Sequence, residues 1–221
     1  MRARRGRDAR TPRVQPVDPQ GLTPADADAL RTDRRVDGLL IEGGDLSGAD
    51  LTDLVLDECR LVRTALGDVR ADGARITDSV LDGVAATTWR AHRAVLRDVL
   101  LTGCRIGAAE WFEADLTRVE LIGCRIDYLG LADARAVDLR LVDCTVGDLD
   151  LRGATAERVA LVGCRVRELS ALGATLQHVD LRGADLERVD GVRALRGTVV
   201  SDEQLLRIAP LLAEEAGIAV E

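Results

Sequence analysis

Four of the five cysteines in this chain recur at a fixed spacing of 20 residues, and thiolates are ligands that zinc prefers. The four are Cys104, Cys124, Cys144 and Cys164. Zinc needs ligands that converge on one point, whereas a coiled chain would align side chains of this spacing in a straight row. Buried cysteine behaves as a small hydrophobic residue, and parallel Cβ vectors give poor disulfide geometry. We therefore expect these thiols to pack in a core, with no metal site and no disulfide.

The remaining residues that could carry chemistry are scattered. His92 and His178 occupy polar positions of the pattern described below, without a second His or Cys cluster near them in sequence. The chain contains no Gly-x-Ser-x-Gly elbow and no phosphate-binding glycine loop. The sequence predicts no catalytic residue, no metal, no cofactor and no enzymatic activity.

A repeat of five residues organises the chain. Stepping by five from Ile41 to Leu186 gives 30 positions, all apolar, and the phase never slips. Two residues before each of them lies a second, mostly small or apolar position, while the other three positions hold nearly all the charged residues and glycines. A helix would repeat every three to four residues and a strand every two. This pattern therefore indicates short extended pieces, each followed by a turn, that bury their apolar side by stacking as a coil.

A second period of 20 residues gives the size of the coil. The cysteine row has this period, and so do six glycines of one phase: Gly43, Gly83, Gly103, Gly123, Gly163 and Gly183. Four five-residue pieces per coil predict a square cross-section, with these glycines at one corner, where a positive φ is needed. Trp89 and Trp111 each have an alanine at the other inward position of the same five-residue piece. A large residue beside a small one keeps the packed volume of that piece constant, so we expect both tryptophans in the core.

The two ends of the repeat predict four segments. Residues 1–20 are basic and rich in Pro, which predicts a disordered tail. Residues 21–38 are expected to cap the first coil, with Thr23 as the N-cap of a helix over 24–32. The solenoid spans 39–190, and 191–221 form a C-terminal cap. There, Ser201 and Gln204 form a capping box before a helix that Pro210 should kink or split.

The C-terminal helix has two interpretations. It is either a lid on the last coil or a homodimer contact, since its apolar residues exceed what a lid needs. These apolar residues are Leu205, Leu206, Leu211 and Leu212.

Charge and composition limit the classes of partner and the location that the sequence predicts. The net charge of -8 conceals a basic start, since residues 36–221 alone carry 21 Arg and 33 acids. An acidic surface argues against direct nucleic-acid binding. No apolar run reaches the ~18 residues that a membrane helix needs, and the Arg-rich start lacks the apolar region of a secretory signal. Together with unpaired cysteines, these features favour the cytoplasm.

The A-D-L-x-x strings resemble the pentapeptide-repeat family; examples are Ala49-Asp50-Leu51, Ala114-Asp115-Leu116 and Ala184-Asp185-Leu186. The resemblance covers roughly residues 39–190 and implies an all-β fold, a right-handed, four-sided parallel β-helix. One branch of this family resembles double-helical DNA and protects DNA gyrase from quinolones. This chain differs from that branch: its central residues are mostly Leu, its register is unbroken, and its outer surface mixes Arg with acids.

We therefore expect a protein-binding scaffold with an unknown protein partner; the alternative is a DNA mimic that binds gyrase or another type II topoisomerase. Ile122, Val142 and Val162 share one outward phase, with Ala160 alongside, and are the predicted partner contact. A neighbouring row of Arg105, Arg125 and Arg165 is expected to pair with Asp127, Asp143 and Asp148.

Overall fold

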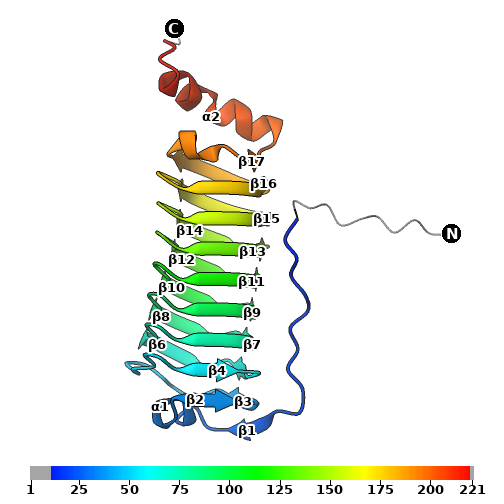
Figure 1. The fold of residues 1–221 in the computed structure, drawn as a ribbon, viewed down its shortest axis with the longest axis vertical. Helices are drawn as coiled ribbons and strands as arrows, with labels where there is room; N and C mark the ends of the chain where they lie inside the picture. Colours follow the sequence, from blue (N-terminus) through cyan, green and yellow to red (C-terminus); the bar gives the residue numbers. More distant parts are fainter. Residues whose placement is uncertain (1–10, 220–221) are drawn as a thin grey trace, which may run out of the picture.

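The computed structural model describes residues 11–219, and these form a straight stack of coils with a helix over its C-terminal end (Figure 1). The strands are β1 (Thr23–Ala25), β2 (Arg35–Asp37), β3 (Leu39–Glu42), β4 (Val55–Asp57), β5 (Arg60–Val62), β6 (Ala65–Arg70), β7 (Arg75–Asp82), β8 (Ala85–Arg90), β9 (Val95–Thr102), β10 (Arg105–Glu110), β11 (Asp115–Ile122), β12 (Arg125–Gly130), β13 (Arg135–Val142), β14 (Thr145–Asp150), β15 (Thr155–Ser170), β16 (Thr175–Asp190) and β17 (Thr198–Val199). The helices are α1 (Ala29–Thr32), η1 (Val192–Leu195) and α2 (Asp202–Glu215).

Pairing between coils is parallel and follows the 20-residue period. Leu121 on β11 lies opposite Leu141 on β13, which lies opposite Leu161 on β15. All 30 central residues of the five-residue repeat are buried. The predicted fold, a right-handed, four-sided parallel β-solenoid, is confirmed.

The core also confirms the packing predictions. Trp89 and Trp111 are 2% and 0% exposed and meet edge to face, with ring centroids 5.1 Å apart. The five cysteines are free and buried. The Sγ of Cys144 lies 3.4 Å from the carbonyl oxygen of Leu121 in the previous coil. Hydrogen bonding within the row, followed by burial, raises the pKa of Cys124 to about 12, so this thiol stays protonated at neutral pH.

The corners need more left-handed backbone than the glycine row predicted. Thirteen non-glycine residues of the described chain have a positive φ, among them Asp53, Arg63 and Asp138. They occupy three phases of the coil, whereas we expected one corner of this kind. The predicted corner does hold Gly103 (φ 58°) and Gly123 (φ 61°). At Gly183 the pairing of β15 with β16 shifts register, and a positive φ is absent.

The solenoid is longer at its N-terminal end than the repeat suggested. Thr23 does not cap a helix over 24–32, because Thr23–Ala25 is strand β1 and pairs with β3. Only the single turn α1 is helical, and its N-cap Asp28 makes no side-chain cap hydrogen bond. Strand β2 adds another pairing, with β4. Backbone pairing to the open edge satisfies more donors and acceptors than a short helix would. The solenoid therefore has about 9 turns.

The N-terminal tail also differs from the prediction where the structure describes it. Residues 1–10 lie outside the described residues. Residues 11–20, expected to be disordered, instead follow an extended path along the outside of the solenoid (Figure 1). They are anchored by contacts that no local sequence pattern reveals. The backbone N–H of Arg13, for example, donates to Oδ1 of Asp138 at 2.9 Å.

The C-terminal helix covers the last coil with its two buried residues, Gln204 and Ile208. Ser201 and Gln204 form the predicted capping box. The Gln204 side-chain amide also donates to the carbonyl oxygens of Leu181 and Ala184, at 2.7 and 2.6 Å. Pro210 lies inside α2, which continues to Glu215, so the helix is not split. Because the helix covers edge groups of the last coil, it acts as a lid.

Candidate interaction surfaces

The predicted apolar ladder is formed as the spacing requires. Ile122 pairs with Val142, and Val142 pairs with Val162, at the ends of β11 and β13 and within β15. Val162 is 42% exposed, while Ile122 and Val142 are half-buried. Ala160, expected alongside, is only 8% exposed and adds little to this surface. The ladder is thus a narrow apolar strip; partner contact there stays a prediction.

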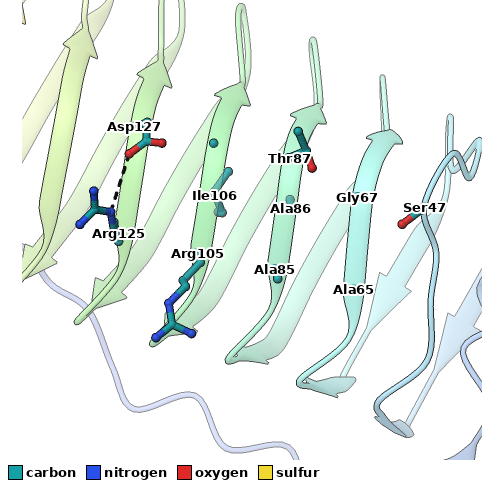
Figure 2. A pocket seen from close by; sticks show the side chains of 11 residues that line it. Ser47, Ala65, Gly67, Ala85, Ala86, Thr87, Arg105, Ile106, Arg125 and Asp127 are labelled. Atoms are coloured by element: carbon teal, nitrogen blue, oxygen red, sulfur yellow. Dashed lines mark ion pairs between the residues drawn. The ribbon is translucent and has the colours of Figure 1, made fainter.

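A shallow trough of about 430 Å³ crosses the N-terminal half of a different face (Figure 2). Its floor is made of small residues such as Ala65, Ala85 and Gly107. A Cβ added at Gly107 would lie 2.5 Å from the carbonyl oxygen of Thr87, so neighbouring coils approach too closely here for a side chain. The guanidinium groups of Arg105 and Arg125 rise at one edge of the trough (Figure 2).

The prediction that nearby acids form ion pairs with the row of Arg105, Arg125 and Arg165 is largely wrong. Arg125 approaches Asp127 with its Nε 3.8 Å from Oδ1, and both side chains are 72% exposed. Within the part of the chain that the structure describes, Arg105 and Arg165 form no ion pair. The carboxylate of Asp148 is held by Arg167 at 2.7 Å instead. Arg167 lies in the coil that follows Asp148, so a residue of the neighbouring coil takes this carboxylate.

An external aromatic cluster was missed by the sequence analysis. The rings of His92 and Phe112 are 5.2 Å apart, and those of Phe112 and Tyr128 are 6.4 Å apart. Gly130 makes room for them, since a Cβ there would lie 2.5 Å from Phe112. The available signal was compositional: the single Phe and the single Tyr of the chain both occupy outward positions close in sequence. The hydroxyl of Tyr128 donates to Asp150 at 3.0 Å.

One corner of the solenoid carries a column of charged residues that alternates only in its second half. The column consists of Glu58, Asp78, Asp98, Arg118, Asp138, Arg158 and His178, and all have a positive φ. Arg118 forms a two-point ion pair with Asp98 of the previous coil. Arg158 does the same with Asp138, at 2.7 and 3.0 Å. Burial opposes the charge of Asp138, but hydrogen bonds from Arg158 and Arg13 outweigh it, so the pKa of this carboxyl is lowered.

Five-residue repetition of this kind is matched directly by a family model. The model for pentapeptide repeats matches residues 150–188 as 8 copies, within the stretch where central residues are buried and coils pair at 20-residue intervals. Residues 150–188 are thus pentapeptide repeats, as the resemblance implies. Such repeats account for the flat faces, because each coil places equivalent side chains above those of the last.

Several solved structures are similar to this one, at low identity. HetL from the cyanobacterium Nostoc sp. strain PCC 7120, involved in heterocyst differentiation regulation, is 19% identical, with 76% of this chain and 90% of HetL covered and a TM-score of 0.31. Full-length QnrB1, a plasmid-mediated fluoroquinolone resistance protein, is 17% identical, with 90% and 100% covered and a TM-score of 0.26. Rfr23 from the cyanobacterium Cyanothece 51142 is 14% identical, with 73% and 95% covered and a TM-score of 0.18. A search of curated proteins gives no match.

Two further observations concern the residues that the structure describes. Among residues 11–219, no three His, Cys, Asp or Glu side chains are grouped so that they could hold a metal ion. Over the same range, no helix is long and apolar enough to cross a membrane.

Proposed function

We propose that this pentapeptide-repeat protein is a non-enzymatic scaffold that binds a partner protein through the ladder of Ile122, Val142 and Val162. The observation that carries the proposal is the register of these residues on three successive coils, with Val162 42% exposed. When a partner covers an apolar strip on an otherwise charged surface, removal of that strip from water stabilises the complex.

The rigidity of the solenoid supports this function. Each coil is held to its neighbours by backbone hydrogen bonds, so the ladder is ordered before a partner arrives, and association loses little conformational entropy. Charged residues beside the strip would form a polar rim. A flat, preformed surface of this kind suits recognition of a folded partner better than the enclosure of a small substrate.

The test is a comparative affinity capture with mass spectrometry from lysate of the source cells. Val142→Arg places a charge in the middle of the ladder, and we expect it to abolish capture of proteins that the wild type retains. Leu172→Arg, at an exposed leucine on another face, is the matched control and should retain them. Thermal unfolding of both variants should match the wild type. Equal capture by all three proteins would contradict the proposal.

The alternative function is DNA mimicry toward gyrase or another type II topoisomerase, and charge is the observation that favours it. Residues 36–221 carry 33 acids against 21 Arg. In the charged column, however, Arg118 and Arg158 neutralise Asp98 and Asp138. A gyrase supercoiling assay tests the alternative. Inhibition at micromolar protein that Glu58→Arg weakens would favour mimicry, and no effect at that concentration would remove it.

A further inference from the structure

Residues 11–20, called the strap from here on, run along the charged corner column (Figure 1). The backbone of Arg13 contacts Asp138, while Asp18 binds Arg60 with 2.6 Å between Oδ1 and Nη2. These anchors on the solenoid lie about four coils apart, or ~19 Å at the spacing of adjacent strands. The five residue steps from Arg13 to Asp18 reach at most ~18 Å when fully extended, and the Asp18 side chain supplies the rest.

The strap holds to the solenoid without joining its sheet. Three of its ten residues are proline, which has no N–H to donate to a strand and favours an extended backbone. Pro12, Val14, Val17 and Pro19 are half-buried, whereas the residues between them are exposed. Contact therefore includes a few aliphatic groups and the two anchors. Exposed ion pairs such as Asp18 with Arg60 contribute little, so this anchor adds little to holding the strap in place.

The middle of the strap covers carboxylates that it does not neutralise. A hollow of about 290 Å³ separates the strap residues 15–20 from Glu58, Asp78 and Asp98. Asp98 is paired with Arg118. Within residues 11–219, the side chains of Glu58 and Asp78 form neither a hydrogen bond nor an ion pair. No Arg lies in the strap between residues 14 and 20, so a segment with basic side chains would complement this surface better than the strap does.

We propose that the corner column from Glu58 to Asp138 is a docking surface for an extended, basic, proline-containing segment of a partner protein, and that the strap occupies this surface as an internal competitor. The strap itself shows what the surface accepts: an extended backbone, aliphatic contacts and a backbone N–H that donates to Asp138. Its displacement opens the surface. This surface is separate from the ladder of Ile122, Val142 and Val162, so either proposal can fail alone.

The first experiment releases the strap in the full chain. Val17→Asp puts a carboxylate into the hollow beside Glu58 and Asp78, where burial and like charge both disfavour it, and it leaves the docking surface unaltered. Leu172→Asp is the control for an aliphatic-to-acid change elsewhere. Amide hydrogen exchange over residues 11–20 should be at least about threefold faster in Val17→Asp than in the control or the wild type. Unchanged exchange would overturn the proposal.

The second experiment measures binding of a fluorescent decapeptide of alternating Arg and Pro, with alternating Glu and Pro as the control peptide. Because the strap occupies the surface for most of the time, its release should tighten binding of the basic peptide by at least about threefold. Adding Glu58→Gln with Asp78→Asn should cancel that gain. Adding Glu42→Gln with Asp143→Asn, an equal change of charge on another corner, should not. A gain that persists without Glu58 and Asp78, or that is absent, overturns the proposal.

Discussion

Asp138 is a single residue that serves the turn, the charged column and the strap. Its backbone has φ 58°, a conformation that Asp tolerates better than most residues. Its side chain is only 7% exposed, and that of Arg158 is 13% exposed. A carboxylate this well buried needs its partner, since removing one member of such a pair leaves an uncompensated charge.

Arg158→Met should therefore destabilise the protein by about 1–3 kcal/mol at neutral pH, while keeping the apolar stem of the side chain. The pKa of Asp138 is lowered in the folded state from its ordinary 3.8. The pair's contribution is then present above pH 3.8 and is lost as pH falls through the lower folded-state value. Urea unfolding at neutral pH and below about pH 3 measures the difference.

The control for this prediction is Arg167→Met. Arg167 pairs with Asp148, and the two side chains are 53% and 39% exposed. Such exposed pairs contribute less than about 1 kcal/mol, so this variant should change stability little at either pH. A loss of stability in Arg158→Met that is equal at both pH values would contradict the assignment to Asp138.

Tyr128 allows a second prediction at this scale, because it is the only tyrosine in the chain. Burial, followed by its hydrogen bond to Asp150, raises the pKa of Tyr128 to about 12. Spectrophotometric titration of the phenolate should give a midpoint near that value, and Asp150→Asn should lower it. The midpoint should return to about 10 in concentrated urea. A folded-state midpoint at the ordinary value would show that the hydroxyl is free in water.

At the scale of the element, α2 stabilises the last coil through Gln204. The edge of a solenoid leaves backbone carbonyls without donors, and the Gln204 amide satisfies those of Leu181 and Ala184. Gln204 is also 6% exposed and completes the capping box with Ser201. One side chain thus holds the start of the helix and the end of the sheet together.

We expect Gln204→Ala to cost about 1–3 kcal/mol in the local stability of the last coil, since it leaves two carbonyls without partners. Hydrogen exchange should accelerate in β16 but not in β11, because coils of a solenoid contact only their neighbours. Glu203→Ala, at the adjacent and exposed position of α2, is the matched control. Equal exchange in β16 for both variants would contradict the role of Gln204.

The sequence predicts those elements whose buried positions follow the five-residue pattern. The inward positions from Ile41 to Leu186 follow from apolar residue types, and stacking of the ladder follows from the 20-residue period. The strap has no such period, and its contact with Asp138 spans 125 residues of sequence. Strand β1 was mistaken for the start of a helix because Thr23 resembles an N-cap locally, while pairing with the distant β3 determines its structure.

The candidate surfaces were predictable only where residue type was enough. Ile122, Val142 and Val162 were found because outward aliphatic residues stand out. The trough below Arg105 was missed, since it depends on how closely Gly107 approaches Thr87. The aromatic cluster was missed because Phe112 and Tyr128 meet across a corner, and a search within one phase of the repeat does not bring them together.

At the scale of the whole molecule, the C-terminal end has an outer apolar face. Leu205 and Leu206 are 46% and 76% exposed, and Leu211 and Leu212 are 39% and 36% exposed. The lid uses only Gln204 and Ile208 as buried residues of α2. A homodimer through this face would bury the exposed leucines.

If α2 forms that contact, sedimentation velocity at tens of micromolar should give a dimer, and Leu206→Glu should convert it to a monomer without loss of helix signal in circular dichroism. The reason is the cost of burying a carboxylate in an apolar contact. Glu203→Ala should remain dimeric. A wild-type monomer at this concentration would leave α2 with the role of a lid alone.

The extended strap sets a constraint on how this chain can change in length. Its extended length only just spans the distance between Arg60 and Asp138. The number of coils between those anchors is therefore fixed as long as both contacts persist. Insertion of 20 residues between the anchors would keep all faces aligned but would move the anchors further apart than the strap can reach. Insertion of five residues would also rotate every later coil by about a quarter-turn. Growth or shrinkage of the repeat is free only beyond Asp138, on the C-terminal side.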